Sequence, residues 1–273
     1  MPPAKLLRRK SIRPIENLRP GEPRDDDIAI EEPLEFRVAG HSIAVVMRTP
    51  GHDRELAAGF LLTEGVIRHR DDVLDIVPCP TTAGDAGPRE NVLNVLLAPS
   101  VSFDPARFTR HVFTSSSCGI CSRSSIEAVH VAFPPIVEPF SPRADLLAGL
   151  PEKLRANQGA FAATGGVHAS ALFDSAGAME IVREDVGRHN ALDKVIGHAF
   201  FADRLPLRER ILLVSGRVSF EIMQKALAAG IPCVAAISAP TTAAIEFAEA
   251  SGQTLVAFLR GTRMNVYAGT LAG

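Results

Sequence analysis

Short apolar runs alternate with helical patterns through the second half of the chain. The runs Ile211–Val214, 232–237 and 254–259 have the length of buried strands. After the first two runs, apolar residues recur with the helical period, from Ser219 onward and over residues 243–250. Strands that alternate with helices in this order are typical of parallel βαβ units, whose sheets are covered on both faces. The pattern therefore predicts an α/β fold in this part of the chain.

The first half of the chain has shorter patterned segments. Apolar and polar residues alternate over residues 34–38 and 43–48, on either side of a glycine-containing turn, which predicts a β-hairpin. Residues 52–63 have the helical period, and residues 92–97 have the composition of a strand. Residues 78–88 are rich in Pro, Thr, Gly and Ala, which predicts a loop.

These patterns divide the chain into three parts. We expect residues 1–27 to form a flexible polar tail, because a basic stretch is followed there by Asp25-Asp26-Asp27. An arm that binds a partner is the alternative. Residues 28–105 are expected to form a smaller β-rich subdomain, and residues 106–273 the α/β domain. A chain of 273 residues is long enough for one large domain with a smaller companion.

Composition and charge exclude several classes of function. The formal net charge is −2 and aromatic residues make up 5% of the chain, so neither a basic field nor a stacking surface argues for nucleic acid. No apolar stretch approaches the ~18 residues of a membrane span, and the first residues lack the apolar core of a signal peptide. Four cysteines in so long a chain do not form a disulfide framework. We therefore expect a cytoplasmic protein without a membrane or nucleic-acid partner.

Two closely spaced cysteines are the strongest chemical signal in the sequence. Cys118 and Cys121 lie in a run of serines, glycine and other small residues, where a thiol can act as a nucleophile or bind a metal. Cys79 and Cys233 each stand alone, so the pair is not half of an evident four-cysteine metal site. The sequence therefore predicts chemistry at Cys118 and Cys121.

Two other uses of a C-x-x-C pair fit the sequence less well. A zinc site would need further ligands, and the spacings of His111 and His130 match no standard zinc pattern. The zinc deaminases need H-x-E before the cysteines, whereas here His168 follows them and Ser170 stands in place of Glu. A thioredoxin-like redox pair would lie at an early strand-to-helix junction rather than among serines in mid-chain.

Three successive strand ends carry groups that suit an anion. Ser215-Gly216-Arg217 follows the first apolar run, residues 238–242 follow the second, and Arg260-Gly261-Thr262-Arg263 ends the third. The first two lead into helix N-termini, which favour phosphate, and arginine binds phosphate with two hydrogen bonds. The alternative is that the serines and threonines only cap helices. Neither phosphate-loop nor dinucleotide glycine motifs occur in the sequence.

A dense polar segment spans residues 184–194. A helix from about Arg188 would place His189 and Asp193 on one face, and Asn190 and Lys194 on the next. These side chains could orient a substrate or move a proton, or they could form a solvated helix surface. His168, after a pair of glycines, could take part or be structural.

Six motifs in unchanged order resemble the formate dehydrogenase accessory sulfurtransferase family (FdhD type), from about residue 28 to the C-terminus. They are Arg48-Thr49-Pro50-Gly51-His52-Asp53 with Glu55-Leu56-Ala57-Ala58-Gly59-Phe60-Leu61, Cys118-Gly119-Ile120-Cys121, Thr164-Gly165-Gly166-Val167-His168, Glu184-Asp185-Val186-Gly187-Arg188-His189-Asn190-Ala191-Leu192-Asp193-Lys194, Ser215-Gly216-Arg217 and Arg263-Met264-Asn265-Val266-Tyr267.

The resemblance implies a sulfurtransferase that acts as a sulfur carrier. It would accept sulfur as a cysteine persulfide from a cysteine desulfurase and pass it to the bis-(molybdopterin guanine dinucleotide) molybdenum cofactor, which formate dehydrogenase needs in sulfurated form. The resemblance also implies a three-layer α/β/α sandwich similar to the cytidine deaminase fold, without a structural metal, and a possible homodimer. Its cofactor-binding segment maps onto Phe258, Leu259, Arg260, Gly261, Thr262 and Arg263.

The family and the residue patterns together give a site hypothesis. Cys118 would carry the persulfide and Cys121 would assist, with Arg123 as a candidate cation beside them. The cofactor would also contact Ser215-Gly216-Arg217 and His189. The alternative function is a non-catalytic chaperone that binds the guanine dinucleotide cofactor while the cysteines only protect or position it.

Overall fold

The structure is a computed structural model that describes residues 6–79, 89–107, 129–130, 132–138 and 140–272. Its larger sheet has six strands in the order β10-β9-β11-β12-β13-β14. Their bounds are β9 (His168–Phe173), β10 (Met179–Asp185), β11 (Ile211–Val214), β12 (Cys233–Ala236), β13 (Thr254–Arg260) and β14 (Arg263–Ala268). The three central strands β11, β12 and β13 are parallel, and the outer strands are antiparallel to them.

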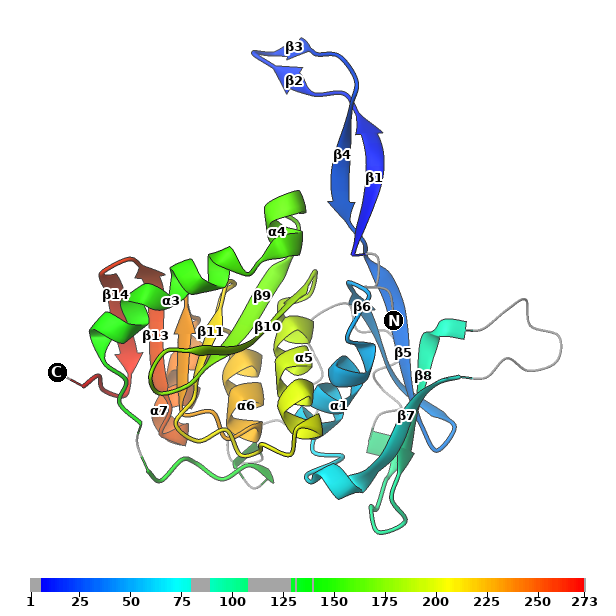
Figure 1. Cartoon of the computed structure of the whole chain (residues 1–273). Helices are drawn as coiled ribbons and strands as arrows, with labels where there is room; N and C mark the ends of the chain where they lie inside the picture. The colour runs from blue at the N-terminus through cyan, green and yellow to red at the C-terminus, as the bar shows by residue number, and fades with distance from the viewer. Residues whose placement is uncertain (1–5, 80–88, 108–128, 131, 139, 273) are drawn as a thin grey trace.

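Helices cover both faces of this sheet (Figure 1). One face packs against α3, and the other against α5, α6 and α7. Alternate strand residues reach the two layers: Leu213 packs in the cluster that contains Leu147 of α3, whereas Leu212 packs in the cluster that contains Leu192 of α5. The α/β/α layering predicted for this part of the chain is confirmed. The helices are α3 (Ala144–Ala156), α4 (Gly159–Thr164), α5 (Arg188–Phe201), α6 (Phe220–Ala228) and α7 (Thr242–Ser251).

The order of strands and helices in the second half is also confirmed. The three apolar runs form β11, β12 and β13, with α6 and α7 between them. In the larger sheet, β9, β11, β12 and β13 are buried along most of their length. Their apolar runs are therefore near-continuous rather than alternating. The four strand residues of β11 and of β12 are fully covered on both faces.

A second sheet is formed by the first half of the chain, in the order β6-β5-β8-β7. The predicted hairpin is confirmed as β5 and β6, and the predicted helix as α1. One strand was missed: Asp75 and Pro78 interrupt its apolar positions, and a bulge follows Val73. Pro78 is tolerated because this strand lies at the sheet edge. The bounds are β5 (Glu32–Val38), β6 (His41–Arg48), α1 (Asp53–Thr63), β7 (Val73–Cys79) and β8 (Arg89–Leu97).

Helices α1 and α5 join the two sheets along a close contact that we call the α1–α5 seam. A side chain at Gly59 of α1 would clash with the backbone carbonyl of Asp193, and one at Gly197 of α5 would clash with that of Glu55. The absence of side chains at these two glycines therefore lets the helix backbones meet. One hydrophobic cluster runs from Phe36 of the small sheet through both helices into the large sheet. The two regions thus share a core.

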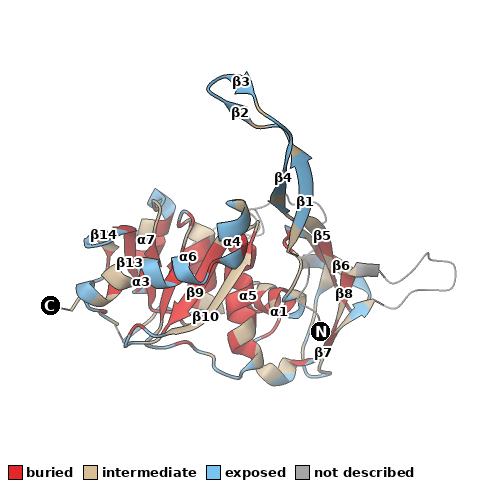
Figure 2. Ribbon diagram, turned by 45° about the horizontal axis from the view of Figure 1, so that its top comes forward, coloured by how far each residue is buried: buried red, intermediate tan, exposed pale blue. Residues whose placement is uncertain are grey.

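Residues 7–29 form a projecting β-hairpin instead of the flexible tail that we expected (Figures 1 and 2). Basic residues of one strand face acidic residues of the other, with Arg9 opposite Asp27 and Lys10 opposite Asp26. The basic and acidic residues attract each other across the paired strands. A tail was predicted because the sequence pattern treats them as two separate polar stretches. The strands are β1 (Leu7–Ile12), β2 (Ile15–Glu16), β3 (Arg19–Pro20) and β4 (Arg24–Ala29). No helix in the described ranges has the length and apolarity to cross a bilayer.

Candidate functional site

The carboxyl ends of β11, β12 and β13 lie at one edge of the large sheet, which we call the strand-end edge. Because β9 is antiparallel to β11, its first residue, His168, comes to the same edge. The Ser215 N–H donates to the Ala169 carbonyl at 2.9 Å, and the Ala169 N–H donates to Ser215 Oγ at 2.9 Å. The Phe258 N–H donates to the Ser238 carbonyl at 3.1 Å. Topology therefore brings the three predicted strand ends together.

Two histidines at this edge, His189 buried and His168 half-buried, are held neutral. His189 is 8% exposed, and its Nε2 lies 3.3 Å from Ser219 Oγ and 3.4 Å from Glu221 Oε2. Burial, followed by the charge of Arg188, lowers the pKa of His189 to about 3. Burial and then Arg188 also lower the pKa of His168. At neutral pH both rings can therefore accept a hydrogen bond without carrying charge.

Gly216 lies against the ring of His168. A side chain at this position would place its first carbon 3.2 Å from His168 Nδ1 and 3.7 Å from the Arg188 side chain. The glycine therefore leaves room for His168 and Arg188 to lie over the end of β11. Arg217, the next residue, is exposed.

Arg188 has an unused donor at this edge. Its Nε is buried and has no hydrogen-bond partner among the described residues. A buried guanidinium N–H without an acceptor is costly, and an anion supplies the acceptor that arginine binds best. Arg188 is also the first residue of α5, where free backbone N–H groups favour negative charge. The edge thus has the chemistry of an anion site.

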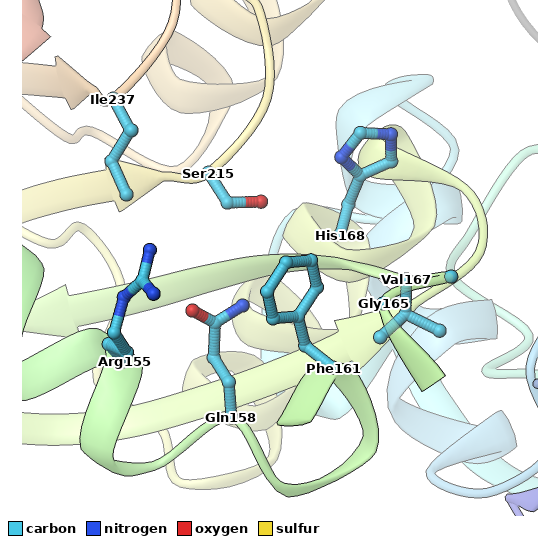
Figure 3. Close-up of a pocket in the computed structure, with 9 residues that line it drawn as sticks. Arg155, Gln158, Phe161, Gly165, Val167, His168, Ser215 and Ile237 are labelled. Atoms are coloured by element: carbon cyan, nitrogen blue, oxygen red, sulfur yellow. The ribbon is translucent and has the colours of Figure 1, made fainter. Parts of the chain in front are cut away.

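A cavity of about 380 Å³ opens beside His168 (Figure 3). Ser215 and Ile237 line it from the strand ends, and α3, α4 and the loop that follows them line it from the other side. The sequence patterns did not single out Arg155, Gln158 and Phe161, which shortly precede the motif that ends at His168. Gly165, Gly166 and Val167, which complete the wall, belong to that motif.

The segment mapped as cofactor-binding is largely at the surface. Phe258, Arg260, Gly261, Thr262 and Arg263 are exposed. Phe258 has a φ of 52° within β13, where the pairing with β14 shifts register, and Gly261 has a φ of 56° in the turn between the two strands. Leu259 differs, because its side chain is fully buried in the cluster under α3. It supports the turn and has no surface to offer a ligand.

Most of the charged residues in the segment 184–194 brace the fold. The predicted helix is confirmed as α5. Asp193 is fully buried against Lys225, whose Nζ lies 3.0 and 2.9 Å from its two carboxylate oxygens. Lys194 pairs with buried Asp185 at 2.6 Å, and Asn190 Nδ2 donates to Asp185 at 3.0 Å. Only His189 and Arg188 of this segment remain directed to the strand-end edge.

Cys118, Cys121, Arg123 and His111 lie outside the described residues. Burial raises the pKa of Cys233 on β12 to about 12, so this thiol has no nucleophilic form at neutral pH. No group of three or more His, Cys, Asp or Glu side chains suited to a metal occurs in the described part of the chain.

The described chain resumes at Val129, which is buried in the core. The ring of His130 packs on Phe247 with 5.3 Å between centroids, and Phe247 packs on Phe220 at 4.9 Å. Phe220 is the first residue of α6 and follows Ser219, the partner of His189. The C-terminal end of the cysteine-bearing segment is thus anchored beside the strand-end edge.

Together these features define an α/β protein with a candidate anion site at the ends of its parallel strands. The model of the FdhD/NarQ family matches residues 29–271, and the chain belongs to this family. A protein of Mycobacterium tuberculosis, named sulfur carrier protein FdhD, is 54% identical over 249 residues, which cover 89% of this chain and 90% of that protein.

Other relatives agree with this assignment. A protein of Streptomyces coelicolor with the same name is 49% identical over 267 residues, covering 96% of this chain and 93% of its own length. A solved structure assigned as a formate dehydrogenase accessory protein from Desulfotalea psychrophila has a TM-score of 0.75. It covers 97% of both chains at 23% identity, and therefore supports the fold. The family prediction is confirmed, whereas the similarity to the deaminase fold stays a prediction.

Proposed function

We propose that this protein carries sulfur as a persulfide from a cysteine desulfurase to the bis-(molybdopterin guanine dinucleotide) molybdenum cofactor, on behalf of formate dehydrogenase. The observation that carries the proposal is the near-complete match to relatives named as sulfur carriers, at about half identity. The C-x-x-C pair supplies the thiols that such a role requires. The protein would act in the cytoplasm as a sulfurtransferase, and we propose a homodimer as its assembly.

The sulfur steps balance with two thiols and one external reductant. The Cys118 thiolate attacks the terminal sulfur of the desulfurase persulfide. A bond forms between Cys118 Sγ and that sulfur, the S–S bond of the desulfurase persulfide breaks, and the desulfurase cysteine leaves as a thiolate. The Cys121 thiolate then attacks the inner sulfur of Cys118 and releases hydrosulfide to the cofactor. The resulting Cys118–Cys121 disulfide takes two electrons from an external dithiol, which returns both thiols.

The strand-end edge suits the anionic part of this cargo. The cofactor carries two diphosphates, and the edge offers the N-termini of α5, α6 and α7 together with Arg188 and Arg217. We propose that Ser215, Gly216 and His189 also line the bound cofactor. The exposed turn formed by Phe258, Arg260, Gly261, Thr262 and Arg263 would hold its second end, with Leu259 as the buried support of that turn.

The covalent chain allows the thiols to reach this edge. Seven residues separate Cys121 from Val129, and the chain from one to the other spans at most about 30 Å when extended. Since Val129 and His130 are anchored next to α6 and α7, delivery of sulfur at the strand-end edge is within reach.

The test is sulfur loading of the full chain by a cysteine desulfurase with cysteine. We expect the peptide with Cys118 to gain the mass of one sulfur atom, and Cys118→Ala to abolish both this adduct and activation of formate dehydrogenase. Cys233→Ala is the matched control, because the buried thiol of Cys233 is not nucleophilic. If Cys118→Ala still accumulated sulfane sulfur and still activated the dehydrogenase, the proposal would be wrong.

A cofactor chaperone is the second candidate, because the strand-end edge can hold an anionic ligand without any thiol. It predicts that a Cys118→Ala/Cys121→Ala protein binds the cofactor and fully supports dehydrogenase activity. The same experiment therefore separates the two functions.

A further inference from the structure

The N-terminal hairpin, residues 7–29, stands almost alone in solvent. Its strands leave the body of the molecule in Figure 1, and they are exposed along nearly their whole length in Figure 2. β1 and β4 have six residues each, so they extend the hairpin by about 20 Å before its tip begins. A two-stranded ribbon without a packed face contributes little to the stability of a fold. The length of the hairpin therefore indicates a role outside the fold.

The turn at the tip of the hairpin has an unfavourable sequence for its backbone. Asn17 and Leu18 lie between β2 and β3, with φ values of 51° and 62°. A two-residue turn with positive φ at both positions favours Asn followed by Gly, because glycine adopts positive φ without a steric cost. Asn17 fits this pattern, whereas Leu18 is strained. Because Leu18 is 96% exposed, contacts within the described chain do not compensate for the strain.

The tip combines apolar and basic side chains. Ile15, which is 62% exposed, lies beside the turn and opposite Pro20. Arg13 and Arg19 are exposed on either side of the turn, and residues 13–24 hold three arginines and two glutamates. Large apolar side chains that are exposed in a strained turn are typical of a contact surface for another molecule. The complementary surface would have an apolar pocket with carboxylates at its rim.

The charges along the hairpin argue against pairing with a second copy of the chain. The free edge of β1 carries Arg8, Arg9 and Lys10, and the free edge of β4 carries Asp25-Asp26-Asp27. A two-fold axis would pair β1 with β1, or β4 with β4, and would place like charges opposite each other, which is destabilising. Pairing of β1 with β4 of the next copy would not close and would build a filament. We therefore expect a different protein at the hairpin.

The base of the hairpin adjoins the cavity beside His168. β4 contacts α4, and a side-chain carbon at Gly166 would lie 3.5 Å from the Ala29 side chain. Gly166 also lines the cavity. In Figure 1 the hairpin rises on the same side of the molecule as α4, which leads into the start of β9 at the strand-end edge. A protein that takes cargo from this edge therefore comes within reach of the hairpin.

We propose that the N-terminal hairpin is the docking element for the protein that receives the cargo, with Leu18 and Ile15 as its apolar anchors. Arg13 and Arg19 would face carboxylates around the pocket that takes Leu18. The identity of the receiving protein rests on the proposed function, under which it is formate dehydrogenase. The hairpin would hold the two proteins together while the cofactor passes from the strand-end edge.

The test measures binding of the full chain to formate dehydrogenase prepared without its cofactor, by surface plasmon resonance. Leu18→Gly should weaken this binding by about tenfold to a hundredfold, the effect of losing one buried leucine side chain. Leu18→Met keeps a large apolar side chain and should bind nearly as tightly as the wild type. Equal affinities of Leu18→Gly and the wild type, or no binding by the wild type, would overturn the proposal.

Leu18→Gly also separates this role from a structural one, because the two roles predict opposite effects on stability. Glycine relieves the strain of the positive φ, so the midpoint of urea denaturation should equal or exceed that of the wild type. A leucine that only supported the hairpin would lower the midpoint when it is removed. Loss of binding together with a lowered midpoint would contradict the anchor, because the fold of the turn would then be what the partner needs.

The arginines at the tip are tested through the rate of association. Charges at the rim of an interface steer the encounter of two proteins and are screened by salt. Arg13→Gln/Arg19→Gln should therefore slow association several-fold at low salt, and the difference from the wild type should shrink as salt is added. Faster association of the double variant would show that the partner surface is basic and that the stated complementarity is wrong.

Sulfur loading distinguishes failure of this proposal from failure of the proposed function. Leu18→Gly should load Cys118 normally, because the hairpin takes no part in accepting sulfur. Normal loading with weakened binding supports the docking role, whereas normal loading with normal binding rejects it and leaves the sulfur carrier standing. Absence of loading in the wild type would overturn the proposed function. Ser11→Ala, on β1 away from the tip, is the matched control and should bind like the wild type.

Other occupants of the tip would give different results. If Leu18→Gly lowered the mass of the protein in sedimentation equilibrium, the tip would bind a second copy and the proposal would be wrong. The same conclusion would follow if the wild type, but not Leu18→Gly, bound vesicles of phosphatidylcholine and phosphatidylglycerol. An unchanged mass and no binding to vesicles support a protein partner.

Discussion

The α1–α5 seam and the strand-end edge are both rich in buried polar groups, but they treat those groups differently. At the seam, Lys225 of α6 donates to both oxygens of Asp193 and to Thr63 Oγ1 at 2.9 Å. At the edge, the buried Arg188 Nε lacks a hydrogen-bond partner among the described residues. The contrast is informative because both regions are supplied in part by one helix, α5.

The difference indicates which polar residues serve the fold and which serve a ligand. A buried charge that is fully paired contributes to specifying how α1 and α5 meet, and it has no capacity left for another partner. A buried donor that is unpaired destabilises the free protein and is satisfied when a ligand binds. Two residues on the same face of a helix can have different roles. His189 and Asp193 share a face of α5, but Asp193 is paired at the seam whereas His189 lies at the strand-end edge.

The largest effect is expected from breaking the seam. Lys225→Met leaves the Asp193 carboxylate buried without its cation, which should lower the free energy of unfolding by about 3–5 kcal/mol. Urea denaturation of the purified chain measures this loss. The double variant Asp193→Leu/Lys225→Met removes both charges and should recover most of the stability. A loss below about 1 kcal/mol in the single variant would show that the pair does not hold the seam.

The next effect is a pH dependence that originates at the edge. The pKa of His189 is lowered to about 3 in the folded protein, so the unfolded chain binds a proton there at higher pH than the folded one. Stability is therefore unaffected by His189 above about pH 6.5, and it falls by about 1.4 kcal/mol per pH unit as the pH drops from there toward 3. His189→Gln should remove this slope.

The comparison of wild type with His189→Gln isolates that slope from other groups. Burial raises the pKa of Asp193 to about 6, so Asp193 makes stability fall as the pH rises between about 4 and 6, the opposite sign. This contribution is present in both proteins and cancels in the difference. Urea denaturation at several pH values between 4 and 7 gives both curves; parallel curves would contradict burial of a neutral His189.

The smallest effect on stability is expected from Arg188→Met. Because the buried Arg188 Nε has no partner in the described chain, Arg188→Met should not lower the free energy of unfolding, and removal of the unpaired donor should raise it by up to about 1 kcal/mol. Affinity for guanosine diphosphate should nevertheless fall about tenfold or more, the loss expected for a hydrogen bond to a charged group. The pKa values of His168 and His189, which Arg188 lowers, should rise in an NMR titration.

Other results for Arg188→Met would contradict this comparison between the seam and the strand-end edge. If Arg188→Met unfolded the protein without weakening nucleotide binding, Arg188 would belong with the bracing residues of the seam. If it changed neither property, the buried Nε would be no indication of a ligand.

Local patterns predicted the parallel strands of the large sheet with the helices beside them, and the central hairpin and helix of the first half, but they did not predict β10, β14, α3 or α4. The strands β11, β12 and β13 and the helices between them were evident because buried strands and amphipathic helices have short, distinct periods. The faces of α5 were evident for the same reason. The strand β7 was missed because Asp75, Pro78 and a bulge break its period, and the N-terminal hairpin was missed because opposite charges pair across strands that are distant in the sequence.

The candidate site was predictable only in outline. Parallel strands have their carboxyl ends at one edge, so Ser215, Ser238 and the turn at Gly261 could be expected to converge. Nothing in the pattern around Gln158 marked it as a buried amide, because its exposure depends on how α3 and α4 lie over the sheet.

By itself, the sequence determined the α/β class, the order of the main strands and helices, the thiol pair Cys118 and Cys121, and the family. Each of these depends on residue type and on spacing along the chain. The tertiary structure alone decided that Asp193 braces the fold while the buried Arg188 Nε has no partner in the described part of the chain. Whether a buried polar group has a partner depends on residues far away in the sequence, such as Lys225 for Asp193, and only the packing of α5 and α6 brings those partners within hydrogen-bond distance.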